Sequence, residues 1–422
     1  MSAPNNDVVV TGLGPVTAVG VGCEALWAAL SAGRSNVTSR KLGIGIGQLV
    51  DMPMAAMPPA ADVPGLEPHL KTLAEQDCPS YRDMAYALLA VESAMTDAGL
   101  RYDREANNLG AIQAFEAPGL ERTVSRLLEL LAGPPPTDGP PPVYDMLAPY
   151  FYSSQAFLYV HVMGKALGFH GFSTSVHNAC SSGAFALEVA AQRIRTGQAD
   201  VMVVVGGEAF DTAVRLEWFR RLDLYAREAR MRPFDDEPSG FYVGEGAAAL
   251  VLESAAHAAK RGATPYAAYL GGAFAHQAAK QTTPDVRAGR LSTVIAGALK
   301  AARLAPRDVD LVVPHGASTA LSDGYEAACL AQALGGACEH AVATVFKPYV
   351  GHLLAASSLI ETICALLAMK HQCVPATLHT RRDHATLAVP LVTTQTRRPV
   401  ETVLKLSTGF TGHDAASVFR RV

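Results

Sequence analysis

The clearest candidate for chemistry is a cysteine at the start of a predicted helix. Cys180 lies in the small-residue turn over residues 179–183, and an alanine-rich helix is predicted over residues 184–195. The positive end of a helix dipole and the unpaired N–H groups there favour a thiolate, the nucleophilic form of cysteine. By residue type alone, a single cysteine is more often an inert core residue. Both interpretations stay open from Cys180 alone.

Two histidines could support such a nucleophile. His315 follows the largely apolar run 309–313, which places it at the end of a predicted strand, where α/β folds build their sites. His352 opens a second apolar helix, predicted over residues 353–369, whose dipole favours a neutral imidazole that can donate a hydrogen bond. A cysteine protease would use one histidine and an orienting side chain, so a two-histidine set fits it less naturally, although spacing alone does not decide.

A lysine and a glutamate complete the candidate set. Lys347 lies between apolar stretches and needs an acidic partner, for which Glu326, on the predicted helix after His315, is the candidate. Either residue taken singly is more often a solvated surface group. Among the 13 histidines and 7 cysteines no H-E-x-x-H motif or close cluster occurs, so we expect no metal site.

Strands and helices alternate along the chain, which indicates layers of sheet and helix. Residues 179–195 and 351–369 share one plan, a reactive side chain in a small-residue turn followed by a helix that is apolar nearly all round. We therefore expect an internally duplicated fold that divides near residue 255 and presents two helix N-termini to one site. The other predicted elements are strands over 8–11, 199–206, 247–253 and 309–313 and helices over 23–32, 83–98, 293–302 and 325–334.

Three further segments need interpretation. Gly12 and Gly14 suggest a dinucleotide fingerprint, but Thr17 stands at its third glycine, so we interpret them as a tight strand-to-loop turn. Residues 51–66 predict an irregular surface excursion, and the proline-rich residues 133–142 predict a stiff loop rather than a signalling ligand. Core packing and an interface or pocket wall are equally favoured for the aromatic residues Tyr144, Tyr150, Phe151, Tyr152, Phe157 and Tyr159.

The composition excludes several classes of protein. With 422 residues, 49% hydrophobic and 18% charged, the chain can bury a large core and is not intrinsically disordered. Its 35 basic and 39 acidic residues do not provide the basic surface that nucleic acids require. We expect no membrane span, because no apolar run approaches about 18–20 residues. The N-terminus does not resemble a secretion signal and the cysteines are scattered, so a cytoplasmic location is expected.

Six ordered motifs together resemble those of the β-ketoacyl-acyl-carrier-protein synthases, the ketosynthases of type II fatty-acid and polyketide assembly in the thiolase superfamily. The similarity extends over nearly the whole chain, and six motifs in order are a specific signal. They are the opening strand from Val8 to Thr17, the nucleophile turn Asn178–Gly183, the central Arg232–Asp235 with Gly240–Ala247, the histidine motif His315–Thr319 with Ser322, Asp323 and Glu326, Lys347 with Gly351–Leu353, and the C-terminal loop Gly409–Ala415.

The resemblance implies an α/β protein with the thiolase-like duplicated five-layer α/β/α/β/α fold, in which two mixed sheets surround buried central helices. Residues 1–255 would form the half that carries the nucleophilic cysteine, and residues 256–422 the half that carries both catalytic histidines. It also implies an acyl carrier protein as partner, and a homodimer or a heterodimer with a ketosynthase-like subunit. No cofactor is implied, because the phosphopantetheine belongs to the carrier protein.

The implied reaction is a decarboxylative Claisen condensation. Cys180 would hold an acyl group as a thioester, and the two histidines would donate hydrogen bonds to the malonyl thioester oxygen. Lys347 paired with Glu326 would set the electrostatics, and the N–H groups of Cys180 and Phe410 would form the oxyanion hole, with Phe410 also acting as a gate. The residues carried over are Cys180, His315, His352, Lys347, Glu326 and Phe410 for catalysis and Thr319, Ala317, Thr411 and Gly412 for substrate binding.

Four positions depart from the family pattern. Ala317 stands where threonine is usual, and Asp414 where asparagine is usual. Ser318 and Thr411 stand where glycine is usual, and Thr411 predicts a stiffer or differently posed gate, because glycine permits backbone angles that threonine resists. These changes favour a specialised polyketide or other metabolite pathway over housekeeping fatty-acid synthesis. The alternatives are a ketosynthase-like acyltransferase and a non-condensing partner subunit.

Overall fold

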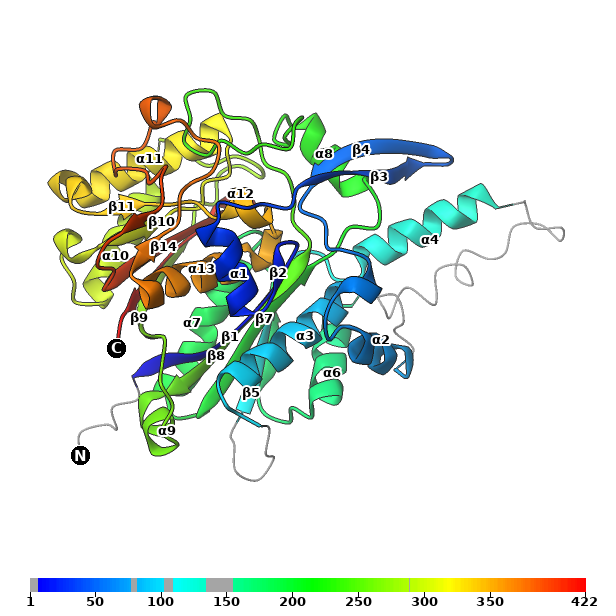
Figure 1. Cartoon of the computed structure of the whole chain (residues 1–422), viewed down its shortest axis with the longest axis horizontal. Coiled ribbons are helices and arrows are strands. Elements are labelled where there is room, and N and C mark those ends of the chain that lie inside the picture. The colour runs from blue at the N-terminus through cyan, green and yellow to red at the C-terminus, as the bar shows by residue number, and fades with distance from the viewer. Residues whose placement is uncertain (1–6, 77–81, 102–108, 134–154, 288) are drawn as a thin grey trace.

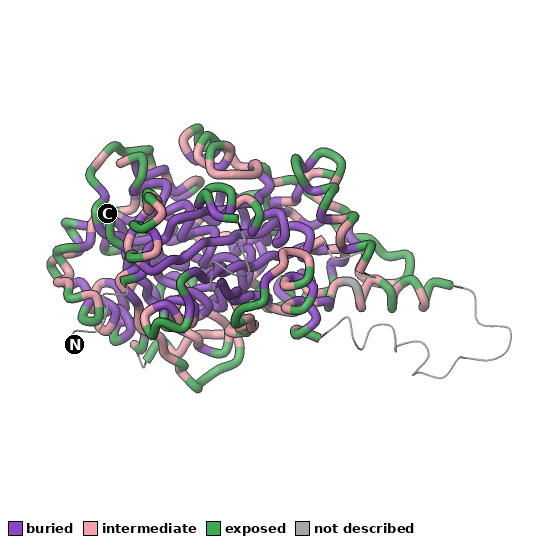
Figure 2. The backbone as a smooth tube through the Cα atoms, turned by 90° about the horizontal axis from the view of Figure 1, so that it is seen from below, coloured by how far each residue is buried: buried purple, intermediate pink, exposed green. Residues whose placement is uncertain are grey.

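The computed structural model describes residues 7–76, 82–101, 109–133, 155–287 and 289–422 (Figure 1). The proline-rich stretch from residue 134 onward lies outside the described residues, as do Tyr144, Tyr150, Phe151 and Tyr152. Of the two remaining aromatic residues, Tyr159 is buried in the core, whereas Phe157 is exposed. Buried chain fills the centre of the molecule, and exposed segments form its outer layer (Figure 2).

One sheet of 11 strands runs through the molecule in the order β11-β10-β14-β15-β9-β1-β8-β7-β5-β6, with β2 paired to β1. If the five strands of each half are numbered along the chain with β2 left out, both halves have the order 3-2-4-5-1 and the same parallel and antiparallel pairs. The duplication is therefore confirmed. The strands are β1 (Val8–Thr17), β2 (Gly20–Val21), β5 (Leu109–Ala114), β6 (Ser173–Val176), β7 (Val201–Glu208), β8 (Gly246–Ser254), β9 (Ala267–His276), β10 (Leu311–Val313), β11 (Val342–Ala343), β14 (Thr402–Gly409) and β15 (His413–Arg420).

The two mixed sets of strands meet edge to edge. Val8–Val10 of β1 pair antiparallel with Ala267–Tyr269 of β9. The two expected sheets are present, but this short ladder joins them into one hydrogen-bonded sheet. The division of the chain at residue 255 stays a prediction.

Helices form the other layers (Figure 1). α7 and α13 pack on each other and on strands of both halves, while α3 covers the N-terminal strands and α10 covers the C-terminal strands. This is the five-layer arrangement that the sequence resemblance implies. The helices are α1 (Cys23–Ser31), α2 (Glu67–Ala74), α3 (Arg82–Asp97), α4 (Leu120–Ala132), α6 (Ala156–Leu167), α7 (Ser182–Arg195), α8 (Val214–Arg221), α9 (Ala255–Lys260), α10 (Arg290–Ala301), α11 (Ala320–Leu334), α12 (Lys347–Val350) and α13 (Ser357–His371).

The central position of α13 corrects one expectation. Leu354–His371 is long and apolar enough, by length and composition, to cross a membrane, whereas we expected no such run. However, 89% of this stretch is buried inside the protein, between the two sets of strands. Its apolar character on all sides therefore reflects a core helix.

Two sequence interpretations were wrong in detail. Gly12 and Gly14 lie inside β1 rather than in a turn, and a Cβ on Gly14 would lie 1.9 Å from the carbonyl oxygen of Ala90 in α3. These glycines allow strand and helix to approach closely. Part of the segment 51–66 is also ordered and buried, because it completes strand β4 (Gln48–Met54), which pairs with β3 (Thr38–Gly45) and buries Met52 and Met54.

Candidate active site

The turn that carries Cys180 is fixed by its own serine hydroxyls. β6 ends at Val176, and α7 begins at Ser182, two residues after the cysteine. The Ser182 hydroxyl accepts a hydrogen bond from Asn178 N (2.8 Å), and the Ser181 hydroxyl donates one to Asn178 O (2.8 Å). Ala179 completes the sharp turn in the left-handed region with φ 49°. Cys180 is thereby held just before the helix N-terminus, with only 6% of its surface exposed.

The protonation state of Cys180 differs from the sequence prediction. Burial raises the pKa of its thiol well above the ordinary value, and Glu116 and Glu208 act in the same direction, whereas Lys347 opposes them. Desolvation of the anion is the largest cause of this shift. The expectation of a preformed thiolate was therefore wrong, and the sulfur is a neutral thiol that must lose its proton during the reaction.

His315 and His352 form a close imidazole pair. Their ring centroids are 5.3 Å apart at an interplanar angle of 75°. His315 follows β10, whereas His352 lies before a 3₁₀ turn (Leu354–Ala356) that leads into α13, so that α13 begins four residues later than predicted. The Nδ1 atom of His352 contacts the Ser357 hydroxyl at 2.6 Å.

Both imidazoles are neutral at physiological pH. Burial lowers the pKa of each histidine well below its ordinary value, and the charges of Lys347 and Lys405 lower both further. Lys347 Nζ lies 3.4 Å from Nδ1 of His315. Because an ammonium group is only a donor, Nδ1 of His315 accepts, and its proton stands on Nε2. The neutral state expected for His352 is present, with burial as its main cause.

The predicted ion pair between Lys347 and Glu326 was wrong. Lys347 Nζ pairs with Glu361 of α13 (2.5 Å) and donates to the carbonyl of His315. Glu326 accepts from the backbone N–H groups of His315 (2.6 Å) and Gly316 (2.9 Å), so it holds the histidine loop directly. Glu361 is the single charged residue in the apolar run 353–369, and this isolation was the available sequence signal.

Phe410 and its neighbours pack against the cysteine turn. A Cβ on Gly409 would lie 2.9 Å from Asn178 O and 3.4 Å from Cys180 N, so that the two backbone segments touch. The Phe410 ring makes edge contacts with Trp218 of α8 at a centroid distance of 5.7 Å and with Phe219 at 6.0 Å.

Two positions where glycine is usual have strained backbones. Thr411 has φ 63° and Ser318 has φ 60°, both in the left-handed region. Thr411 is exposed and its N–H donates to Gln281 O (2.6 Å), while the Ser318 hydroxyl accepts from Arg232 N (2.9 Å). The loop conformation typical of glycine is therefore kept by local hydrogen bonds at both positions.

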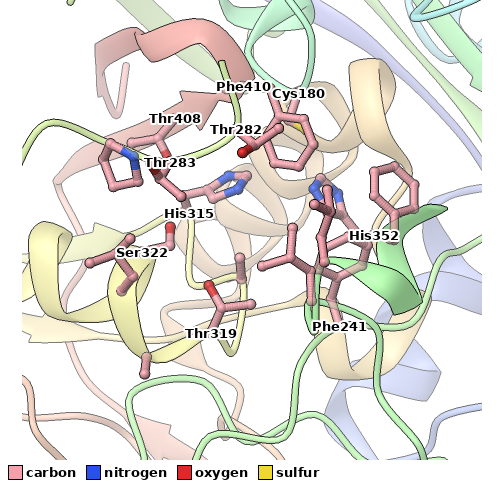
Figure 3. Close-up of a pocket in the computed structure, with 18 of the residues that line it drawn as sticks. Cys180, Phe241, Thr282, Thr283, His315, Thr319, Ser322, His352, Thr408 and Phe410 are labelled. Atoms are coloured by element: carbon pink, nitrogen blue, oxygen red, sulfur yellow. The ribbon is translucent and has the colours of Figure 1, made fainter. Parts of the chain in front are cut away.

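The candidate residues converge on a cavity of about 310 Å³ (Figure 3). Cys180, His315, His352 and Phe410 line it together with Ala317 and Thr319. Thr411 and Gly412 are not among the lining residues, and Lys347 and Glu326 stand behind His315. Phe241, Ser322, Gly409 and Asp414 also line the cavity and belong to the sequence motifs. Sequence reasoning missed the lining residues Phe219, Leu222, Asp223, Leu224, Gln277, Thr282, Thr283, Pro284, Ala320, Leu321, Leu354 and Thr408.

Asp414 adds a buried carboxyl to the cavity wall. It accepts hydrogen bonds from the Tyr325 hydroxyl (2.9 Å) and from Gln277 Nε2 (2.7 Å). Burial raises the pKa of Asp414 above its ordinary value. The departure from asparagine at this position is thus accommodated by two donors.

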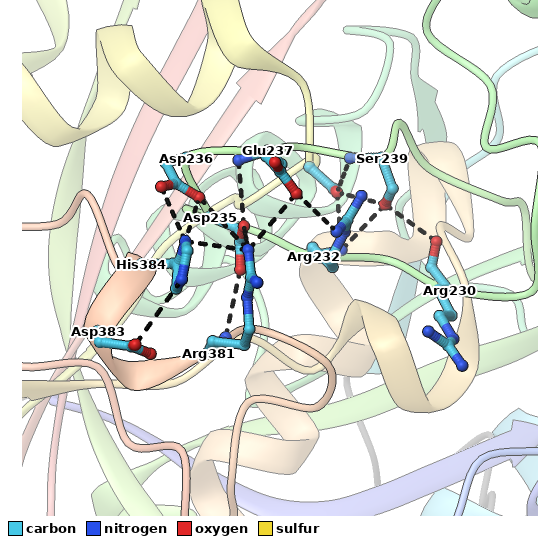
Figure 4. Close-up of polar contacts among 10 residues, drawn as sticks. Arg230, Arg232, Asp235, Asp236, Glu237, Ser239, Arg381, Asp383 and His384 are labelled. Carbon is cyan, nitrogen blue, oxygen red and sulfur yellow. Dashed lines mark hydrogen bonds and ion pairs between the residues drawn. The ribbon is translucent and has the colours of Figure 1, made fainter.

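A second polar cluster ties the loop 230–239 to residues 381–384 (Figure 4). Within the described chain, Asp235, Asp236 and His384 are the only three side chains placed closely enough to hold a metal ion. The Arg381 guanidinium lies 3.6 Å from Asp235 and 3.7 Å from Asp236, and His384 contacts Asp236 at 2.7 Å. The Arg381 guanidinium thus pairs with both carboxylates, and these contacts tie the loop of the central motif to residues 381–384.

The sequence matches known families over most of its length. Residues 5–258 match the family described as beta-ketoacyl synthase, N-terminal domain, and residues 266–381 match the corresponding C-terminal domain. The chain therefore belongs to the beta-ketoacyl synthase family.

Individual relatives cover the whole chain. It is 28% identical to 3-oxoacyl-[acyl-carrier-protein] synthase 2 of Coxiella burnetii over 98% of each chain. It is 29% identical to the oxytetracycline polyketide putative beta-ketoacyl synthase 1 of Streptomyces rimosus, covering 97% of this chain and 96% of the relative. Among solved structures, the ishigamide ketosynthase/chain length factor matches with a TM-score of 0.81 and 27% identity, covering 99% of this chain and 100% of the other.

Proposed function

We propose that this chain is a ketosynthase that condenses an acyl group held on Cys180 with malonyl-acyl-carrier-protein. The observation that carries the proposal is one cavity that joins a buried thiol to two neutral imidazoles. Its volume of about 310 Å³ suits a thioester arm.

In the first half-reaction, the sulfur of Cys180 attacks the carbonyl carbon of an acyl thioester. The thiol proton passes through an imidazole of the cavity to the departing pantetheine sulfur. The N–H groups of Cys180 and Phe410 stabilise the oxyanion, and the contact of Gly409 with the cysteine turn supports this role.

In the second half-reaction, the malonyl thioester loses CO₂, and the electron pair of the broken C–C bond forms an enolate. Nε2–H of His315 and an N–H of His352 donate to the enolate oxygen. Such preorganised donors are worth about 3 kcal/mol each. The enolate carbon then attacks the acyl carbonyl, a C–C bond forms and the C–S bond to Cys180 breaks. The released sulfur takes up a proton from water through an imidazole of the cavity. Lys347 and Glu326 act as positioning residues for His315.

We assign the chain to polyketide or other specialised metabolism rather than to housekeeping fatty-acid synthesis. Relatives with polyketide names and the altered positions Ala317, Ser318, Thr411 and Asp414 support this assignment. The partners proposed are an acyl carrier protein and a second ketosynthase-like subunit, identical or not, since one similar solved structure is a type II PKS acyl-carrier protein in complex with its ketosynthase. The reaction needs no cofactor beyond the carrier's pantetheine, and the location proposed is cytoplasmic.

The decisive experiment follows acylation and decarboxylation separately. The protein is incubated with acyl-carrier protein, its intact mass is measured, and malonyl-carrier protein is then added while CO₂ is recorded. An adduct that is lost in Cys180→Ala but kept in the control Cys23→Ser, followed by CO₂ release, is expected. An adduct without CO₂ release would indicate an acyltransferase, and no adduct would indicate a non-condensing subunit.

A further inference from the structure

We propose that Lys405 is a positioning residue of the condensation site, which acts through Glu361 and Lys347 on His315. The inference rests on the proposed function and adds to it a residue outside the six motifs. Lys405 lies on β14, within the apolar run Val403–Leu406, and only 2% of it is exposed. A buried lysine in a central strand is costly unless it is paired.

The carboxylate of Glu361 bridges two buried ammonium groups. Oε1 pairs with Lys347 Nζ at 2.5 Å, and Oε2 pairs with Lys405 Nζ at 2.7 Å. Lys347 is fully buried and Glu361 is 1% exposed. Each carboxylate oxygen therefore has its own cation in closest contact.

Contacts with three oxygen atoms hold the ammonium group of Lys405 in place. Besides Glu361, its ammonium group donates to the carbonyl of Leu406 and lies 3.4 Å from the Ser407 hydroxyl. The contacts with Leu406 and Ser407 are hydrogen bonds, and the contact with Glu361 is an ion pair. Burial lowers the pKa of Lys405, and the charge of Glu361 opposes this shift. The ion pair thus preserves a cation that the protein interior would otherwise neutralise.

The effect of Lys405 reaches the cavity through Lys347. When Lys405 pairs with Oε2, Lys347 keeps Oε1 and still reaches the carbonyl and Nδ1 of His315. This arrangement holds the imidazole proton on Nε2. Without Lys405, Oε2 would be a buried carboxylate oxygen with no cation, and the carboxylate would rotate toward Lys347 and draw it away from His315.

The charges around the network act on both histidines. Lys347 and Lys405 are opposed by Glu361 and by Glu326, which anchors the same histidine loop. Both lysines lower the pKa of both histidines. Removing the charge of Lys405 should therefore raise the pKa of the imidazoles. The fall of the decarboxylation rate at low pH, which is the acid limb of the pH–rate profile, should then move to higher pH.

The test compares Lys405→Met with Lys405→Arg. In Lys405→Met we expect decarboxylation of malonyl-carrier protein to fall about 10- to 100-fold, as for other residues that orient a reacting group. We expect acylation of Cys180 to change less than about threefold, and the acid limb of decarboxylation to shift upward. Lys405→Arg should restore the wild-type acid limb, because it keeps the charge.

A matched control removes a cation from a buried carboxylate elsewhere. Arg261→Met leaves Glu253, which is fully buried, without its guanidinium partner but does not touch the cavity. It should lower stability and leave the acid limb unchanged. If Lys405→Met does not fold, Lys405→Gln serves in its place.

The outcomes separate this inference from the proposed function. If the wild-type protein does not release CO₂, the proposed function fails. If the wild-type protein releases CO₂, and Lys405→Met or Lys405→Gln keeps both its rate and its acid limb, the role of Lys405 is overturned. The role of Lys405 would also be overturned if decarboxylation and acylation fell by the same factor and the acid limb of decarboxylation did not shift. That pattern indicates a merely structural lysine.

Discussion

The two halves of the duplicated fold carry buried charge networks of opposite balance. In the N-terminal half, the Arg215 guanidinium faces the carboxylates of Glu208 (3.0 Å), Glu121 (3.3 Å) and Glu116 (3.8 Å). In the C-terminal half, the carboxylate of Glu361 faces two ammonium groups. We call Arg215 with its three glutamates the acid-rich network. We call Glu361 with Lys347 and Lys405 the base-rich network.

The same backbone position carries different chemistry in the two halves. Glu116 is the second residue after β5, and His315 is the second residue after β10, the equivalent strand. The duplicated sheet therefore fixes where a side chain stands, and the residue type decides what it does.

Both networks act on the groups of the cavity. The acid-rich network, through Glu116 and Glu208, adds to burial in raising the pKa of Cys180, and the base-rich network adds to burial in lowering the pKa of both histidines. The consequence is a neutral thiol facing neutral imidazoles. The comparison teaches that the thiol and the imidazoles of this active site are neutral before the reaction. Catalysis therefore needs a proton transfer from Cys180 rather than a preformed thiolate.

The largest effect is expected on the base-rich side. His352→Ala removes a donor to the enolate oxygen, so decarboxylation should fall about 10²- to 10³-fold. Acylation of Cys180, measured by intact mass, should change far less. Unchanged decarboxylation would contradict the division of tasks between the two halves.

On the acid-rich side, Arg215→Met leaves three buried carboxyl groups without their common cation. We expect the free energy of unfolding in urea to fall by about 3 kcal/mol. The matched control on the same helix is Arg221→Met, because Arg221 is 78% exposed and pairs only with Glu217 among the described residues. Equal unfolding midpoints for the two variants would show that the acid-rich network is not a buried unit.

The stability of the acid-rich network should depend on pH. Burial, with Glu116, raises the pKa of Glu208 to about 8, so the folded state keeps a proton that the unfolded state has already lost. The free energy of unfolding should therefore fall as pH rises from about 5 to 8, by at most about 1.4 kcal/mol per pH unit, and level off above 8. Denaturation of Glu208→Gln should show a flatter dependence, and a slope as steep as that of the wild type would contradict the assignment.

The smallest effect concerns the two glycine-like loop positions. Thr411→Gly should relieve the left-handed strain and stabilise the protein by up to about 1 kcal/mol, seen as a rise in melting temperature. Ser318→Gly should give no such gain, because it loses the hydrogen bond from Arg232 N. A lower melting temperature for Thr411→Gly would show that its backbone is not strained.

Sequence motifs were sufficient to predict the duplication, the order of Cys180, His315, Lys347 and His352, and most of the central helices. They were insufficient wherever the outcome depends on burial or on partners distant in the chain. The state of Cys180 depends on desolvation, and the partner of Lys347 is Glu361 of the buried helix α13 rather than Glu326. Lys405 carried no motif, and only its isolation in an apolar strand marked it.

The most direct test of the account is the pH dependence of Cys180 alkylation in the free protein. Iodoacetamide labelling, followed by peptide mass mapping with Cys180→Ala as reference, reports the thiolate fraction. The account predicts slow labelling at pH 7 that is still increasing above pH 9, because burial and the acid-rich network keep the thiol protonated. Fast labelling that does not change between pH 6 and 8 would mean a preformed thiolate and would contradict it.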